Sequence, residues 1–199
     1  MIRFILIAIT LLANGHLFAQ TYTKFAPYEK QLIKNSKGET SLRILTIDNE
    51  ADSFQLRKPS FPIDPSKQKK WFDWFAESLF LTVTDSAHLG VGIAAPQVGV
   101  HKRIICIQRF DRENYPWELY INPKILKCSG EKVAGLEGCL SIPNRTDTVF
   151  RQQDVLIEYD LRDGTHKEEV VKGFTSVIFQ HEIDHLNGIL YLDHLYKSE

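Results

Sequence analysis

The most distinctive stretch for chemistry lies near the C-terminal end of the sequence and reads His181-Glu182-Ile183-Asp184-His185. Residues four positions apart project from the same face of an α-helix, so the imidazoles at positions 181 and 185 can bind one metal ion. Glu182 lies next to that face and can take a proton from water and deliver it to a leaving group. The stretch therefore predicts a metal-dependent hydrolytic site on a helix.

A catalytic metal site usually has three protein ligands and one open position, so a third ligand must come from elsewhere. Downstream of the histidine pair are Asp193 and His194, which belong to no clear motif. Upstream is Cys139, a thiol that follows Gly138, and glycine allows a close approach of the backbone. Spacing alone does not decide whether the third ligand comes from the upstream or the downstream residues.

A run of small residues at positions 90–97 ends in the side-chain amide of Gln97. It is either a tight loop with a solvated amide, or a surface for an extended substrate with Gln97 donating to a developing oxyanion. A dinucleotide or phosphate loop is excluded, because the run follows a predicted helix and lacks the further glycine and the lysine.

The elements that position these residues belong to an ordinary globular chain. It has 199 residues, 43% hydrophobic, with 24 basic and 25 acidic side chains and a net charge of −1. Such a composition is typical of one domain with a substantial core. Because the charges nearly balance, the chain lacks the basic field that nucleic-acid binding requires, and we exclude nucleic acid as a partner.

Hydrophobic patterning predicts an α+β fold, with mostly antiparallel strands packed around a central helix that carries the histidine pair. Asp64-Pro65 starts a helix whose aromatic face covers positions 71–83, and Gly173 precedes the central helix at 174–186. Asp163-Gly164 predicts a hairpin turn. Strands are predicted at 42–47, 103–108, 118–121, 124–127, 155–161 and 168–171.

The N-terminus has the pattern of a secretory signal: a basic start, an apolar run and Ala19 where a signal peptidase cuts. We divide the chain into a signal peptide at 1–19, a linker or loosely packed arm at 20–41 and a catalytic domain at 42–199. The mature chain would be exported, to the periplasm, without a stable membrane span. A retained anchor is disfavoured because a span needs about 20 apolar residues. Two further interpretations of the N-terminus are a buried helix of the domain and a chain that stays in the cytoplasm.

Three cysteines, at positions 106, 128 and 139, are too few for a disulfide scaffold. Cys106 lies in an apolar run and is interpreted as a small buried hydrophobe. Whether it pairs with Cys128 depends on the distance between their Cα atoms and stays open.

The runs at 90–97, 137–141 and 180–185 together resemble the three signature stretches of peptide deformylases, in the same order and without a departure inside the motifs. The resemblance extends from about Leu42 to Leu195. It implies a hydrolase that removes the N-formyl group from formyl-methionyl peptides or proteins and releases formate. It also implies that Cys139, His181 and His185 bind one divalent metal ion, Fe²⁺ in the family. The residues themselves suit Zn²⁺ or Ni²⁺ as well.

The same resemblance implies roles for the other candidates. Glu182 would be the acid/base, and Gln97 would form the oxyanion hole with the backbone N–H of Leu140. Substrate contacts are implied for the backbones of Val91, Gly92 and Gly138 and for the side chains of Val177 and Ile178, which would line a methionine pocket.

Two other functions are compatible with these residues. One is an exported metallo-amidase or metallopeptidase that uses the same site on another N-acylated substrate. The other is a catalytically silent domain that binds a metal or a peptide. Retention of Glu182 and Gln97 argues against silence, because a structural metal site needs neither and is normally closed by a fourth ligand. We expect a monomer.

Overall fold

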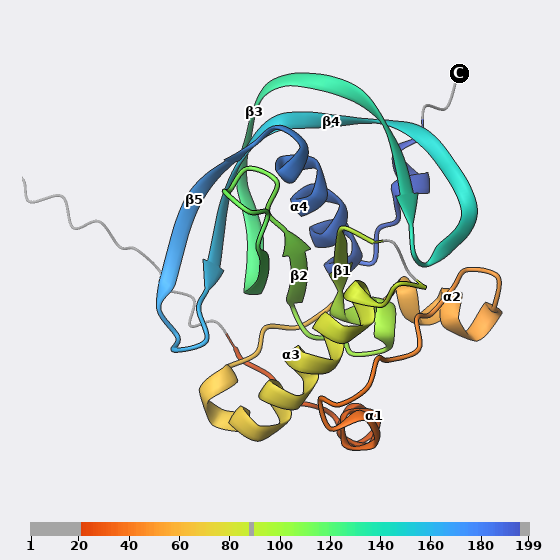
Figure 1. Ribbon diagram of the computed structural model, residues 1–199, viewed down its shortest axis with the longest axis vertical. Coiled ribbons are helices and arrows are strands. Elements are labelled where there is room, and N and C mark those ends of the chain that lie inside the picture. Colours follow the sequence, from red (N-terminus) through yellow and green to blue (C-terminus); the bar gives the residue numbers. More distant parts are fainter. Residues whose placement is uncertain (1–20, 88–89, 196–199) are drawn as a thin grey trace, which may run out of the picture.

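The computed structural model describes residues 21–87 and 90–195, so the expected signal peptide at 1–19 lies outside the described residues. Helix α4 (Gly173–Leu186) occupies the centre, and an antiparallel sheet curves around it (Figure 1). Helix α3 (Lys69–Thr84) covers the other side of the sheet. The predicted α+β class, with a central helix carrying the histidine pair, is confirmed.

The sheet has five strands, and their order in space follows their order along the chain, with antiparallel pairing throughout. The turn between the last two strands contains Gly164 at φ 85°, a conformation that favours glycine. This confirms the predicted hairpin turn at Asp163-Gly164. The strands are β1 (Gly92–Ala94), β2 (Ile104–Gln108), β3 (Trp117–Cys139), β4 (Ile142–Asp160) and β5 (His166–Lys172).

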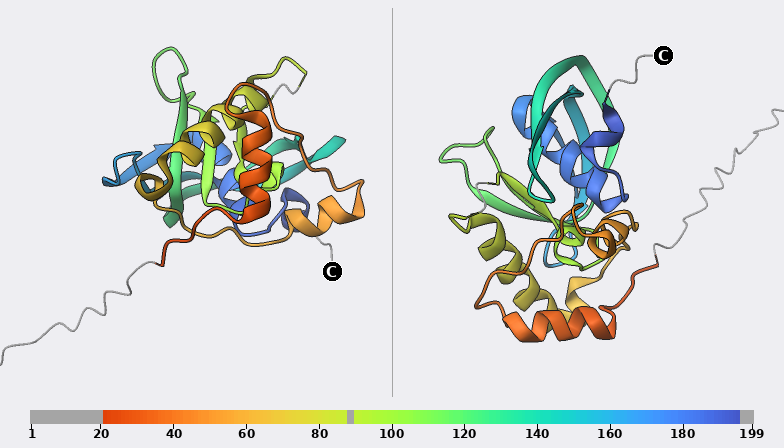
Figure 2. Two further views of the ribbon diagram at one scale, coloured as in Figure 1. Left: turned by 90° about the horizontal axis from the view of Figure 1, so that it is seen from below. Right: turned by 90° about the vertical axis from the view of Figure 1, so that its right-hand side faces the viewer.

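Strands β3 and β4 form a long, bent hairpin that arches over α4 (Figures 1 and 2). The predicted strands at 118–121 and 124–127 are parts of the single strand β3, which is interrupted by register shifts. The predicted strand at 42–47 is wrong. Its segment is extended but lies outside the sheet, because Leu45 N–H donates to Gln97 O (2.7 Å) and Ile47 N–H donates to Ser141 O (3.0 Å).

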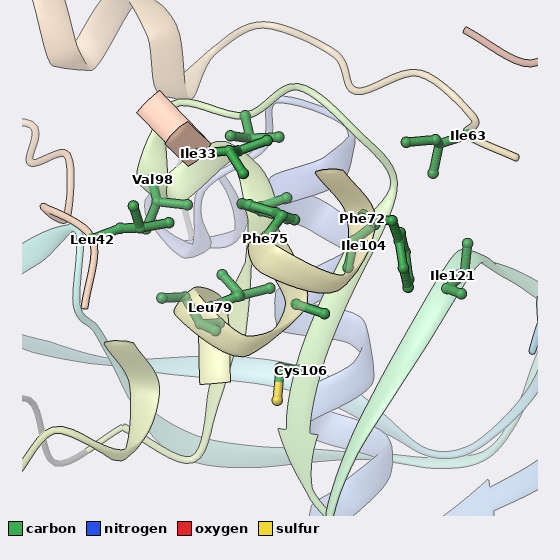
Figure 3. Packing of buried hydrophobic residues seen from close by; sticks show 14 of the residues in the cluster. Ile33, Leu42, Ile63, Phe72, Phe75, Leu79, Val98, Ile104, Cys106 and Ile121 are labelled. Carbon is green, nitrogen blue, oxygen red and sulfur yellow. The ribbon is translucent and has the colours of Figure 1, made fainter. Parts of the chain in front are cut away.

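Two apolar clusters hold the layers together. Helix α3 presents Phe72, Phe75 and Leu79 to one cluster, which includes Ile104 and Cys106 of β2 (Figure 3). The aromatic face predicted for this helix is thereby confirmed. A second cluster packs α4 against the same sheet. Cys106 is buried and Cys128 is exposed, and both are free thiols, so the structure contains no pairing between them.

The linker or loosely packed arm expected at 20–41 is corrected by the structure. Residues 27–36 form helix α1 (Pro27–Ser36), which begins with proline at its first turn and packs against α3 (Figure 2). Ile33 is fully buried and Phe25 is 3% exposed, with the Phe25 ring 6.0 Å from that of Phe75. This segment is part of the core.

Short helices complete the chain around these layers. They are α2 (Glu50–Leu56) and the 3₁₀ segments η1 (Pro65–Gln68), η2 (Ala95–Val98) and η3 (Tyr191–His194). None of the helices within residues 21–87 and 90–195 is long and apolar enough to cross a membrane.

Candidate metal centre

The thiol at the end of β3 and the two imidazoles of α4 converge on one point. One donor atom from each of Cys139, His181 and His185 lies within 4.8 Å of the other two. The Cys139 Sγ and His185 Nε2 atoms are 3.2 Å apart. The helical spacing of four residues therefore places both imidazoles on the face that Cys139 approaches. Asp193 and His194, the two downstream candidates, are not members of this group of donors.

The orientation of His181 is fixed by Glu137, which lies two residues before Cys139 on β3. The Nδ1 atom of His181 is 2.8 Å from Glu137 Oε2, which leaves Nε2 for the donor group. Burial opposes a charge on His181, but hydrogen bonds with Cys139 and Glu137 raise its pKa well above the usual value. Hydrogen bonding of the second ring nitrogen is the common way to set the tautomer of a metal-binding histidine.

Glu137 in turn is held by Arg151 of β4. Arg151 Nε donates to Glu137 Oε1 (2.7 Å), and both side chains are 6% exposed. Although burial acts in the opposite direction, the hydrogen bonds from His181 and Arg151 lower the pKa of Glu137 to about 2. Arg151 also pairs with Asp184 of α4, so one guanidinium links the hairpin to the helix. Glu137 therefore accepts hydrogen bonds as a carboxylate.

His185 is the most enclosed of the three donors, at 1% exposed. Its Nδ1 atom is buried and has no hydrogen-bond partner among the described residues. Burial lowers the pKa of His185 well below its usual value, which keeps the imidazole neutral. A neutral imidazole is the form that binds a metal.

Glu182 is buried at 4% exposure, and its Oε2 atom has no hydrogen-bond partner within the described chain. Burial raises its pKa to about 7. A carboxyl group with such a pKa can both accept and donate a proton near neutral pH. An acid/base at position 182, the role that the sequence predicted, would need this property.

The amide of Gln97 in η2 is held in one orientation. Ala94 N–H donates to Gln97 Oε1 (2.8 Å), and Gln97 Nε2 donates to Ser141 Oγ (3.2 Å). The same Nε2 atom lies 3.6 Å from Cys139 Sγ. The amide is buried and points toward the candidate ligands, so a solvated amide is excluded.

A cleft of about 940 Å³ opens beside these groups, within the size range of small-molecule and peptide sites. His185 is buried and is not among the residues that line the cleft. All the other residues expected at the site line the cleft, namely Val91, Gly92, Gln97, Gly138, Cys139, Leu140, Val177, Ile178, His181 and Glu182.

The sequence prediction missed Glu137 and Arg151. Glu137 lies inside the run 137–141 that the sequence singled out, but no role was assigned to it. Arg151 carried no signal, since only the pairing of β3 with β4 brings it near Glu137.

The donor set fits a catalytic metal site. One thiolate and two imidazoles are ligands that suit zinc and other late transition metals. Within the part of the chain that the structure describes, no fourth histidine, cysteine or carboxylate joins this group. A tetrahedral ion held by these three donors would keep one position for substrate or water. The cleft, the three donors and the buried carboxylate together define a metal-dependent hydrolase.

Comparison with known proteins gives the family. The family described as Polypeptide deformylase matches residues 41–199, and the chain belongs to it. Members of this family remove the N-formyl group from nascent peptides and use a single metal ion. The resemblance of the three motifs is thereby confirmed, and so is the expectation of an enzyme.

Individual relatives agree with this assignment. The chain is 36% identical over 155 residues to the peptide deformylase of Caulobacter vibrioides, covering 77% of this chain and 87% of the relative. It is similar to the actinonin-bound class I type b peptide deformylase of Acinetobacter baumannii, with a TM-score of 0.69, 33% identity and coverage of 79% and 100%. The corresponding values for the Thermotoga maritima enzyme are 0.64, 30%, 79% and 99%.

Proposed function

We propose that this chain deformylates formyl-methionyl peptides or proteins, with Cys139, His181 and His185 holding the metal ion. The observation that carries the proposal is Glu182, a buried carboxylate with an unpartnered oxygen in the cleft beside the donors. A silent domain would have no use for such a group, because burying an unpartnered carboxylate costs free energy. When bound, the ion would supply Lewis acidity toward the formyl oxygen and toward water.

The residues of the chain would perform the proton transfers. Glu182 would accept a proton from the attacking water and deliver it to the peptide nitrogen as the C–N bond breaks, which leaves formate and a free amino terminus. Gln97 Nε2 and the Leu140 N–H would donate to the oxygen on which negative charge develops. The fixed orientation of the Gln97 amide supports this role, since a preorganised donor needs no reorganisation during the reaction.

The substrate would lie extended along the cleft. The backbones of Val91, Gly92 and Gly138 are at its wall and would pair with the peptide as an additional strand does. Val177 and Ile178 lie on the α4 side and would contact the first side chain. A formyl carbon bears only hydrogen, so a narrow site can admit it and exclude an acetyl group.

We also propose that residues 1–19 direct export and are removed near Ala19. Thr23 N–H donates to Pro62 O (2.8 Å) and Phe25 is buried, so the cut would leave the packed residues intact. The enzyme would then act in the periplasm on formylated peptides or on exported proteins. The resemblance implies Fe²⁺, but an oxidising compartment threatens ferrous iron, and Zn²⁺ or Ni²⁺ would be the more durable ion there.

Two experiments test these proposals. Formate release from formyl-Met-Ala-Ser, with acetyl-Met-Ala-Ser as the matched substrate, should be detected for the formyl peptide alone. Equal hydrolysis of both would favour a broader amidase, and no hydrolysis of either would favour a silent domain. Fractionation of the host with N-terminal sequencing should find a periplasmic protein that starts at Gln20. A cytosolic protein that still starts at Met1 would contradict export.

A further inference from the structure

Helix α1 lies outside the part of the chain that the family match covers. The family match begins at residue 41, whereas α1 spans Pro27–Ser36. A segment that served only as a tether would leave its polar residues in water. Instead, α1 buries a carboxylate, because the whole Glu29 residue is 1% exposed. A buried charge is costly unless it is paired and hydrogen-bonded. The partners of Glu29 therefore show which other segment of the chain α1 is bound to.

Both oxygens of Glu29 are used. Oε2 accepts from the N–H of Ala26, at the start of α1 (2.6 Å). Oε1 accepts from the N–H of His101 (2.8 Å), and Lys102 Nζ lies 3.3 Å from Oε2. The Lys102 side chain is 5% exposed, so the ion pair is enclosed on both sides. Glu29 therefore joins α1 to residues 101 and 102.

Residues 101 and 102 end the loop that carries Gln97. This loop is a compact unit, because the N–H of Gly99 donates to Pro96 O and the N–H of Val100 donates to Ala95 O. Helix α1 contacts it at further points. Ile33 of α1 packs with Val98 and with Phe75 of α3 (Figure 3), and a Cβ at Gly99 would lie 3.8 Å from Leu32 Cδ1.

We propose that α1, through Glu29, positions the Gln97 amide for the reaction. The inference rests on the proposed role of Gln97 as a donor to the oxyanion. Glu29 does not touch the cleft, so it is a positioning residue and not a catalytic one. The loop is held on one side by Ser141 and Leu45. On the other side Glu29 binds the N–H of His101, whose carbonyl oxygen accepts from Phe61 N–H. Without the bond from Glu29, the N–H side of this anchor is lost and the loop would shift, and a misplacement of about 1 Å can remove much of a donor's effect on the transition state.

The test is a double-mutant cycle between positions 29 and 97, measured on the full mature chain with formyl-Met-Ala-Ser. Glu29→Gln should lower kcat roughly tenfold with KM changed less than about twofold, because the interaction lost belongs to the transition state. In the Gln97→Ala background, the same substitution should lower kcat by less than about twofold. Glu39→Gln, an exposed position just after α1, is the matched control and should change neither constant.

Two results would overturn the inference: an unchanged kcat for Glu29→Gln, or an equal loss of kcat in both backgrounds, which is the mark of a purely structural role. Should Glu29→Gln not fold, Leu32→Ala enters the same cycle, since it removes a side chain of α1 that packs against the cluster containing Val98 without disturbing the buried charge. A normal kcat for Gln97→Ala alone would instead refute the proposed role of Gln97. The two failures are therefore distinguishable.

Discussion

The backbone of Gly92 lies directly against the carboxylate of Glu182. A methyl group at position 92 would sit 2.5 Å from Oε1 and 3.0 Å from Cδ of that carboxylate. Real Cβ atoms do not approach other heavy atoms so closely, so the glycine leaves the space that the Glu182 side chain occupies. The absence of a side chain at the start of β1 thus lets the Glu182 side chain of α4 lie against the strand.

We predict that Gly92→Ala lowers kcat by about 100-fold or more, the usual contribution of a general acid/base, because the added methyl displaces Glu182. Bound metal should stay stoichiometric, since position 92 supplies no ligand. Kinetics and metal analysis of the purified variant check this. Gly135→Ala, where a Cβ meets nothing within 4 Å, is the matched control. Comparable activity in the two variants would show that Glu182 tolerates the methyl.

Substitutions at the metal centre should separate binding from turnover. Glu182→Ala is expected to retain the metal and to lose at least about 99% of activity. Cys139→Ala or His185→Ala should lose the metal itself, since each removes one of three donors. Elemental analysis alongside formate release decides between these outcomes. Activity of Glu182→Ala above about a hundredth of the wild-type value would contradict the assigned role.

Glu137→Gln should weaken metal binding by about 10- to 100-fold, because the carboxylate that orients His181 and pairs with Arg151 loses its charge. Competition with a chelator of known affinity measures the change. Glu131→Gln, an exposed glutamate on the same hairpin, is the control. Equal chelator resistance in the two variants would show that the hydrogen bond to His181 does not affect the metal.

Substrate preference should follow the apolar wall of the cleft. We predict that kcat/KM is higher for a formyl-Met peptide than for the matching formyl-Asp peptide by about tenfold or more, since a buried carboxylate without a partner costs at least about 1.4 kcal/mol. A series of formylated tripeptides that differ only in the first residue measures this. Equal rates for Met and Asp would show that Val177 and Ile178 do not contact the first side chain.

The stability of the fold should depend on pH through His101. This residue is 5% exposed, and burial lowers its pKa, with Glu29 acting in the opposite direction and Lys58 and Lys102 adding to the decrease. Below pH of about 6.5 the unfolded chain takes up a proton that the folded chain resists, so the free energy of unfolding falls by up to about 1.4 kcal/mol per pH unit. Above that pH His101 is neutral in both the folded and the unfolded chain, so it no longer lowers the free energy of unfolding.

His101→Gln removes this titration and should flatten the dependence. Urea unfolding at pH 7.5 and pH 5.5 measures the difference for wild type and variant. His166→Gln, at a histidine whose side chain is 56% exposed, is the matched control. The prediction is wrong if the wild type and His101→Gln lose the same stability on acidification.

Strong periodicity explains what the sequence could predict. Helix α3 was predictable because Phe72, Phe75 and Leu79 recur at helical spacing, and α4 because its histidines and apolar residues share that period. The site residues were predictable because three motifs carry most of them. In these segments, the spacing of apolar residues along the sequence matches the faces that are buried in the structure.

Tertiary pairing explains what was missed. The far half of β3 is exposed and includes Gly130 and Gly135, so it shows no apolar alternation, and only its pairing with β4 makes it a strand. Helix α1 is polar on average, and its few apolar side chains are stabilised by α3. Leu45 looked like a strand residue but pairs instead with the loop of Gln97. Each depends on a contact far away in sequence.

The donors of the metal centre also come from two separate parts of the chain. Cys139 ends β3, whereas His181 and His185 follow β4 and β5. The thiol and the imidazoles therefore meet only where α4 packs against the sheet. An ion shared by Cys139 and α4 would tie the helix to the sheet, so that metal binding would add to the free energy of folding.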